Sequence, residues 1–309
     1  MNSTSPSPRV IAAMLTPCSQ PGQPDLDVLG PWSARLVAGG CDGLFICSST
    51  GELPLLGRAQ RRAMIATVKN AVGHRAAVYA GISAMGVADA IECANDAAEA
   101  GADVGVAMVP FFLKLAPSEM EAFFVEIADA SPIPVALYHH VRMPSEIDVA
   151  TAARLAEHPN IVAMKDSSRD VERIPGLSSA GSGRWDVYQG SESLILESLE
   201  RGATGSVSAL ANAAPDWHRD LADAWERSDH AAAEVAQQKI AALSEMFSFA
   251  ALGHCFDRFA HSVRRAAHRR GLLDAKHGMI KGVEPDPEFD RQLDTHFDRI
   301  GLDRMDSGS

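Results

Sequence analysis

A lysine stands at the end of a predicted buried strand, where its amine could act as a nucleophile. Residues 160–168 begin as a short apolar run and end in Lys165 followed by small polar residues. Such a run, bounded by turn residues, is typical of a buried parallel strand. Side-chain alternation is expected to place on one face Ile161, Ala163 and Lys165. A lysine there is costly unless it is paired or uncharged, and an uncharged amine attacks carbonyl groups. We therefore predict that Lys165 is a Schiff-base lysine; the alternative is a strand-end lysine that points to water.

The other lysines offer no comparable position. The chain has six lysines, and only Lys165 falls at the carboxyl end of a predicted strand. Lys114 falls in a loop beyond the strand predicted over residues 103–110, where it could reach solvent or a partner. A single lysine at a strand end favours a chemical role for Lys165.

A tyrosine ends the preceding predicted strand, residues 135–139. Tyr138 alternates with the small residue Ala136 on one face, which leaves room for the phenol. Consecutive strands of a parallel barrel are neighbours, so Tyr138 and Lys165 are expected to meet. A tyrosine beside an imine can carry protons to and from the substrate; the alternative is a core tyrosine with a backbone partner. His139 is expected to face away from Tyr138, so His139 and His140 cannot both enter the site, and no metal site is predicted.

A loop rich in hydroxyl groups follows the strand predicted over residues 41–48. Residues 48–51, here called the hydroxyl loop, read Ser-Ser-Thr-Gly and are followed by Glu52. Hydroxyl and backbone N–H groups at such a place can hold a carboxylate. The alternative is a solvated loop with a turn glycine, and only the position after a strand favours binding. Cys47, just before the loop, could line a site, although burial is the better expectation.

The elements that would position these residues alternate regularly along the chain. Strands are predicted over residues 10–17, 41–48, 76–83, 103–110, 135–139, 161–165, 185–189 and 204–210. Helices are predicted over residues 26–38, 58–72, 87–100, 149–157, 171–177, 191–201 and 216–227, with one more that begins at a Ser118–Glu121 capping box. Eight strand–helix units in 309 residues predict an α/β fold, a closed (β/α)8 TIM barrel. A dinucleotide-binding GxGxxG turn and a P-loop are both absent from the sequence.

The tail after the eighth unit contains no strand pattern and is predicted to be helical. We expect residues 1–230 to form the barrel and residues 231–309 to form a C-terminal helical extension packed on it. Within this extension His254, His261 and His268 recur every seven residues. Two helical turns separate successive members, which is too far for one metal ion, so a partly exposed helix stripe is expected.

Composition narrows the classes of partner and the compartment. The net charge of −12 and the lack of basic clusters argue against nucleic acid and anionic membranes. The odd number of cysteines, five, without a CxxC pair, is typical of reduced thiols in the cytoplasm. The first ten residues lack a signal-peptide pattern, and no apolar run is long enough to span a membrane.

Five short motifs, each at a predicted strand end, together resemble the dihydrodipicolinate synthase / N-acetylneuraminate lyase family. They are Ser48-Ser49-Thr50-Gly51-Glu52, Tyr138, Lys165-Asp166-Ser167-Ser168, Gly190-Ser191-Glu192 and the segment 202–208 with Asn212 and Pro215. The resemblance covers residues 10–227, with a fainter match in the tail.

The resemblance implies a metal-free class I aldolase or lyase that acts on pyruvate or other 2-keto acids and needs no cofactor. By the same resemblance, Lys165 would form the imine and Tyr138 would carry protons. Ser49 and Thr50 would bind the keto-acid carboxylate, and the Val207 carbonyl would face the imine. The distal part of the substrate would meet Gly190, Ser191 and Glu192. Members of the family are commonly homotetramers, so a homo-oligomer is expected.

Departures from the synthase pattern favour a different branch. The loop after the fourth predicted strand carries Phe111-Phe112 where the synthase has a tyrosine. The usual Tyr-Asn-x-Pro reads Tyr138-His139-His140-Val141, and the synthase arginine has no in-register match, since Arg142 follows a different spacing. The favoured function is therefore cleavage of a 2-keto-3-deoxy sugar acid to pyruvate and an aldehyde. The alternatives are a synthase-type condensation, a dehydratase or hydratase-aldolase that uses the same imine, and a non-catalytic keto-acid-binding protein.

Overall fold

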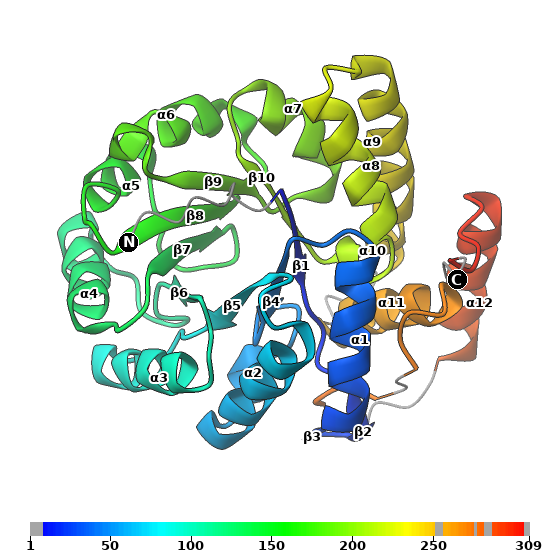
Figure 1. Cartoon of the computed structure of the whole chain (residues 1–309), viewed down its shortest axis with the longest axis horizontal. Helices are drawn as coiled ribbons and strands as arrows, with labels where there is room; N and C mark the ends of the chain where they lie inside the picture. The colour runs from blue at the N-terminus through cyan, green and yellow to red at the C-terminus, as the bar shows by residue number, and fades with distance from the viewer. Residues whose placement is uncertain (1–8, 251–255, 275–276, 281–285, 306–309) are drawn as a thin grey trace.

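The computed structural model describes residues 9–250, 256–274, 277–280 and 286–305, and its centre is a closed parallel barrel (Figure 1). Eight strands follow the order β1-β10-β9-β8-β7-β6-β5-β4, and β1 pairs with β4 to close the ring. Figure 1 shows the helices arranged around the outside of these strands. The predicted (β/α)8 barrel is confirmed.

The barrel strands are shorter than most of the sequence predictions. Their bounds are β1 Val10–Ala13, β4 Gly43–Ile46, β5 Ala77–Gly81, β6 Val104–Met108, β7 Val135–His140, β8 Ile161–Ser167, β9 Asp186–Gln189 and β10 Gly205–Ser208. A small antiparallel hairpin, β2 Cys18–Gln20 and β3 Gln23–Pro24, lies outside the barrel. The strand β8 is the longest, and it extends two residues beyond the predicted end at Lys165.

The helices alternate with the strands as predicted, and two of them begin with a 3-10 turn. The barrel helices are α1 Leu26–Ala38, α2 Arg58–Val72, α3 Val87–Glu99, α4 Pro117–Ala130, α5 Val149–Leu155, α6 Ile174–Ser178, α7 Ile195–Glu200 and α8 Pro215–Glu226. The helices predicted over 171–177 and 191–201 each begin as a 3-10 turn, Val171–Arg173 and Glu192–Leu194. The predicted capping box on α4 is wrong. Proline starts the helix at position 117, and Glu119 accepts a hydrogen bond from the Ala116 backbone N–H at 2.8 Å.

The barrel interior and the layer between strands and helices form two separate apolar clusters. The interior cluster contains Ile11, Ala13, Phe45, Tyr79, Val106, Met108, Ala136, Tyr138, Ala163, Tyr188 and Val207. One prediction about β8 is wrong, because Ile161 belongs to the outer cluster whereas Ala163 belongs to the interior. In the pairing of β7 with β8, Val135 pairs with Ile161 and the next residue, Ala136, pairs with Ala163. The extra residue in β8 reverses the side of the strand on which Ile161 lies.

The C-terminal extension is helical, as predicted. It contains α9 His230–Ser244, α10 Met246–Ala250, α11 Phe256–Arg269 and α12 Pro287–Arg299. Helix α9 packs on α8 of the barrel. The boundary at residue 230 remains a prediction.

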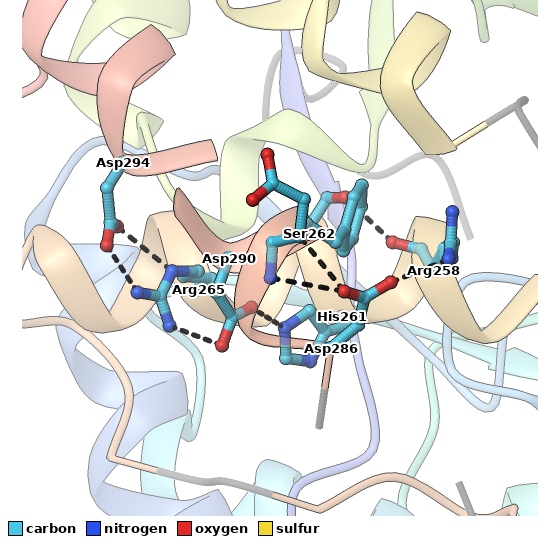
Figure 2. A network of polar contacts seen from close by, with 9 residues as sticks. Arg258, His261, Ser262, Arg265, Asp286, Asp290 and Asp294 are labelled. Atoms are coloured by element: carbon cyan, nitrogen blue, oxygen red, sulfur yellow. Dashed lines mark hydrogen bonds and ion pairs between the residues drawn. The ribbon is translucent and has the colours of Figure 1, made fainter. Parts of the chain in front are cut away.

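A row of pairs, each of a basic and an acidic side chain, joins α11 to α12, and Figure 2 shows those of Arg258, His261 and Arg265. The pairs of this charge ladder are Arg258–Asp286, His261–Asp290, Arg265–Asp294 and Arg269–Asp298. Both members advance in the same direction, so the two helices run parallel. Exposed pairs of arginine with aspartate contribute roughly 0.2–1 kcal/mol each and are screened by salt. Of the predicted histidine stripe, His261 lies in this ladder and His268 is near Asp274 at 3.6 Å, while His254 falls outside the described residues.

The cysteines are free and buried where the structure describes them. Cys18, Cys41, Cys47 and Cys93 form no disulfide, and Cys255 lies outside the described residues. Burial raises the pKa of the Cys47 thiol to about 12, so this group is a packed apolar residue, as expected. Within the described ranges, no helix is both long and apolar enough to cross a membrane.

Candidate active site

The pairing of β7 with β8 brings Lys165 and Tyr138 together. The two residues are register partners in the parallel ladder, and both point into the barrel interior. The Lys165 Nζ lies 4.3 Å from the centroid of the Tyr138 ring and 5.8 Å from that of Phe45. Both side chains are buried, at 6% and 2% exposure. The predicted meeting of amine and phenol is confirmed, and the amine lies over the rings of Tyr138 and Phe45.

The Tyr138 hydroxyl connects this pair to the hydroxyl loop. The Ser49 Oγ lies 3.2 Å from the Tyr138 hydroxyl, and either atom can donate. Ser49 follows β4, so a loop from the first half of the chain completes a site on β7 and β8. Tyr138 thus contacts the Lys165 amine with its ring and Ser49 with its hydroxyl. Sequence reasoning assigned Ser49 to carboxylate binding and missed this contact, because alternation places a strand residue but not the end of a loop.

Hydrogen bonds within the hydroxyl loop and to the segment after β1 hold the loop in place. The Gly51 N–H donates to the Ser48 Oγ at 3.1 Å, and the Ser48 hydroxyl donates to the Met14 carbonyl at 3.2 Å. The Thr16 hydroxyl donates to the Gly51 carbonyl at 2.6 Å, and Thr50 is buried. These bonds hold the loop in one shape beside the Tyr138 phenol.

The turn after β9 lies directly against Lys165. The Gly190 N–H donates to the Asp166 carbonyl at 2.7 Å. A Cβ at Gly190 would lie 2.8 Å from the Lys165 Cε and 1.9 Å from the Ser167 Oγ. Glycine at this position therefore lets the turn approach the lysine side chain closely. The next residue, Ser191, is half-buried and its N–H donates to the Gln189 side chain at 2.7 Å.

Glu192 is directed toward the end of β10. Its Oε1 lies 3.1 Å from the Ala209 N–H and 3.3 Å from the Ser208 Oγ. The carboxylate is only partly buried, so the residue can still face a ligand with its remaining surface. Val207, one residue before Ser208, is part of the interior cluster. The structure thus brings Gly190 against the lysine and ties Glu192 to the neighbouring strand.

Ser208 joins Glu192 to a buried histidine on α8. The His218 Nε2 lies 3.0 Å from the Ser208 Oγ, and its Nδ1 lies 2.8 Å from the Ala214 carbonyl. Because a carbonyl only accepts, Nδ1 carries the proton, and the single Ser208 hydroxyl proton can go either to the neutral Nε2 or to the Glu192 carboxylate. Burial lowers the pKa of His218 to about 4, so the ring is neutral near pH 7.

Asp166 lies on the opposite face of β8 from Lys165. Its Oδ2 accepts from the Arg173 Nε at 2.9 Å and its Oδ1 accepts from the Ser168 N–H at 2.6 Å. Arg173 also reaches Glu146 at 2.5 Å and the Ile147 carbonyl at 2.6 Å. This cluster, in which Asp166 and Arg173 are buried and Glu146 is exposed, ties the end of β8 to the segment after β7. Its acidic and basic types were visible in the sequence, but their pairing was not.

The two histidines after Tyr138 take opposite sides, as predicted. His139 is the register partner of Asp166, and the charges that act on it are those of Asp166, Arg173 and Glu146. His140 lies beside Tyr138, with ring centroids 6.1 Å apart. Burial and the nearby Lys165 lower the pKa of His140 to about 4. Among the described residues there is no group of three acids, histidines or cysteines that could hold a metal ion.

Comparison with known proteins shows the family of this chain. A sequence model described as the dihydrodipicolinate synthetase family matches residues 6–273. The chain belongs to this family. Its members are pyruvate-dependent lyases and synthases of the Schiff-base type, so the predicted family and enzyme class are confirmed.

Relatives of the dihydrodipicolinate synthetase family match over most of the chain. 4-Hydroxy-tetrahydrodipicolinate synthase 1 of Streptomyces coelicolor is 37% identical over 253 residues, which are 81% of each chain. The synthase of Synechococcus sp. strain CC9605 is 37% identical over 74% of this chain and 77% of that protein. The family protein YagE of E. coli K12, solved in complex with pyruvate, has a TM-score of 0.88 at 25% identity. That match covers 95% of this chain and 99% of the other.

The approach of Gly190 to Lys165 generates a prediction for this family member. Changing Gly190 to alanine should displace the lysine side chain and lower the rate of its reaction with pyruvate by about 100-fold, because small displacements of reacting groups are costly. The rate is measured by borohydride trapping and mass spectrometry. The matched control is Gly86→Ala, whose Cβ would meet only the Asp89 carboxylate at 3.9 Å. Equal trapping by the two variants would contradict the prediction.

The buried His218 generates a prediction about stability and pH. Its folded pKa of about 4 lies below the reference value of 6.5, so the unfolded chain binds more protons between these values. Stability should therefore fall as the pH drops from 6.5 to 4, by up to about 3 kcal/mol from this residue. Urea unfolding of the wild type and of His218→Asn should converge toward low pH. A constant difference between the two proteins across this range would refute the assignment.

Proposed function

We propose that the chain is a class I aldolase in which Lys165 forms an imine with pyruvate or a related 2-keto acid. The observation that carries the proposal is the contact of the Lys165 amine with Tyr138, whose hydroxyl in turn reaches Ser49. An amine among ring faces, a proton carrier beside it and a hydroxyl-rich loop within reach are the parts that imine chemistry requires. The family's pyruvate-bound neighbour YagE supports the choice of keto acid.

The reaction would begin with attack of the Lys165 nitrogen on the keto carbon. The carbonyl oxygen leaves as water after two proton transfers, which Tyr138 and Ser49 would mediate. The imine then accepts electrons, and loss of a C3 proton gives an enamine. Ser49 and Thr50 of the hydroxyl loop would hold the carboxylate during these steps.

The second half of the proposed reaction joins the enamine to an aldehyde. The enamine C3 attacks the aldehyde carbon, whose oxygen takes a proton, and water then hydrolyses the imine and frees Lys165. Gly190, Ser191 and Glu192 would border the aldehyde-derived part of the product, with the Val207 carbonyl near the imine. The curated relatives are named synthases, which favours this condensation over the sugar-acid cleavage that the sequence favoured.

Cleavage of a 2-keto-3-deoxy sugar acid is the second candidate, and the loop after β6 favours it. The synthase pattern has a tyrosine there, whereas this chain has Phe111 and an 83% exposed Phe112, neither of which can relay a proton. In cleavage, Tyr138 would remove the proton of the C4 hydroxyl and the C3–C4 bond would break to leave the pyruvate enamine. Both directions use the same imine.

The test is reduction of the protein with borohydride in the presence of pyruvate, followed by peptide mapping. We expect a reduced pyruvate adduct on Lys165 that disappears in Lys165→Ala. The control variant Lys114→Ala removes an exposed loop lysine and should be trapped like the wild type. An adduct on another lysine, or none, would disprove the imine mechanism.

Product assays then separate the candidate reactions. Consumption of pyruvate with an added aldehyde indicates condensation, and release of pyruvate from a 2-keto-3-deoxy sugar acid indicates cleavage. Loss of water from the sugar acid without pyruvate release would indicate a dehydratase. Trapping of pyruvate without turnover of any of these would indicate a non-catalytic binding protein.

We also propose that a second copy of the chain covers part of the barrel mouth. Loops after the neighbouring strands β5, β6 and β7 expose Met85, Phe112, Leu113 and Val141 at 45–83%. Apolar side chains grouped in this way are typical of protein interfaces. Light scattering coupled to size-exclusion chromatography should give at least a dimer, and Phe112→Asp should shift it toward monomer. A monomeric wild type would contradict this.

The cytoplasm stays the expected compartment.

A further inference from the structure

The segment that carries the hydroxyl loop is bounded by two residues in an uncommon backbone conformation. Cys47 has φ of 54° and Glu52 has φ of 60°. For residues other than glycine this left-handed region is unfavourable, and it persists only where the surroundings hold it. The four residues of the hydroxyl loop lie between these two points, so whatever holds them also sets the shape of the loop.

The backbone conformation of Cys47 is held by the neighbouring strand β5. The Cys47 carbonyl lies so close to β5 that a Cβ at Gly81 would be 1.9 Å from its oxygen. Only glycine leaves room for this approach. The start of the loop is thus fixed within the barrel itself.

The backbone conformation of Glu52 is held by the C-terminal extension. The Glu52 side chain is fully buried, and its Oε2 lies 3.5 Å from Nη1 of Arg264 on α11. The Met279 N–H donates to its two oxygens at 3.2 and 3.3 Å. Arg264 is itself 4% exposed, and Gly278 packs so tightly on it that a Cβ there would be 2.6 Å from Nη1. Glu52 therefore joins the loop to a segment 212 residues away in sequence.

A buried ion pair is weak evidence for stability, because desolvation offsets much of the attraction. Its geometric effect is clearer, since a charge inside the protein must stay next to its partners. The carboxylate cannot leave Arg264 and the Met279 N–H without a large penalty. The backbone at position 52, and with it the hydroxyl loop, is held in place by this requirement.

We propose that Glu52 is a positioning residue, and that the extension acts through it to hold the hydroxyl loop for the substrate carboxylate. This inference rests on the function proposed above. Glu52 itself is fully enclosed and does not face the substrate. Its effect should therefore appear in the binding of a keto acid and not in the reactivity of Lys165 toward carbonyl groups in general.

The test compares two carbonyl probes in borohydride trapping at Lys165. Pyruvate carries the carboxylate that the loop would bind, and acetone lacks it. The variants are Glu52→Gln and Arg264→Met, with Arg264→Lys as the conservative variant that keeps the charge. The matched control is Arg265→Met, which removes the adjacent arginine of the same helix, paired with Asp290 and Asp294 of α12 in the charge ladder (Figure 2).

In Glu52→Gln and Arg264→Met, the pyruvate concentration for half-maximal trapping should rise about tenfold or more, because displaced binding groups lose much of their effect. Trapping by acetone should stay within about twofold of wild type. Arg264→Lys should recover part of the pyruvate affinity, and Arg265→Met should resemble wild type. Parallel losses for both probes, or no change for either, would overturn the inference.

Hydrogen exchange separates failure of this inference from failure of the proposed function. If wild-type Lys165 is not trapped by pyruvate, the proposed function fails. The positioning role of Glu52 is then judged from the hydrogen exchange of residues 47–56. Glu52→Gln should raise this exchange above that of Arg265→Met, with or without pyruvate. Equal exchange in the two variants would overturn the inference by itself.

Discussion

The parallel register of β7 and β8 is the constraint on which the site depends. It places Tyr138 directly beside Lys165, so the amine lies 4.3 Å from the ring without any loop having to fold into position. Strand residues are held by ladder hydrogen bonds on both sides, and groups built on them are more precisely placed than groups on loops. The loops after β4 and β9 then approach a pair that already exists.

Each approaching loop depends on a glycine or on a long-range contact. Gly190 brings the turn after β9 against the Lys165 side chain, where a methyl group would collide. The hydroxyl loop reaches Tyr138 through Ser49, and its far end is tied to α11 through Glu52. The C-terminal extension is therefore more than a cover on the barrel, because a side chain from it contacts the segment that borders the site.

The sequence predicted the features that follow from local rules. Period-two alternation and strand order were enough to bring Tyr138 and Lys165 together and to turn His139 away. Local irregularities were missed: the register shift in β7–β8 moved Ile161 to the outer layer, and a proline moved the start of α4 ahead of Ser118. The contacts of Glu52 could not be predicted. Its partners Arg264 and Met279 are far away in the sequence, and no local pattern encodes how their segments pack against the loop.

Alternation along β8 also explains how an acid can directly follow Lys165, the lysine proposed to react. A carboxylate on the same face as Lys165 would pair with the ammonium form and stabilise it, which would oppose attack on a carbonyl. Asp166 instead points to the opposite face, where Arg173 and the Ser168 N–H satisfy it. The barrel wall thus separates the two adjacent groups, with the acid held in a charged cluster outside and the amine among aromatic rings inside. The same strand carries the proposed nucleophile on one face and a structural tie to the segment after β7 on the other.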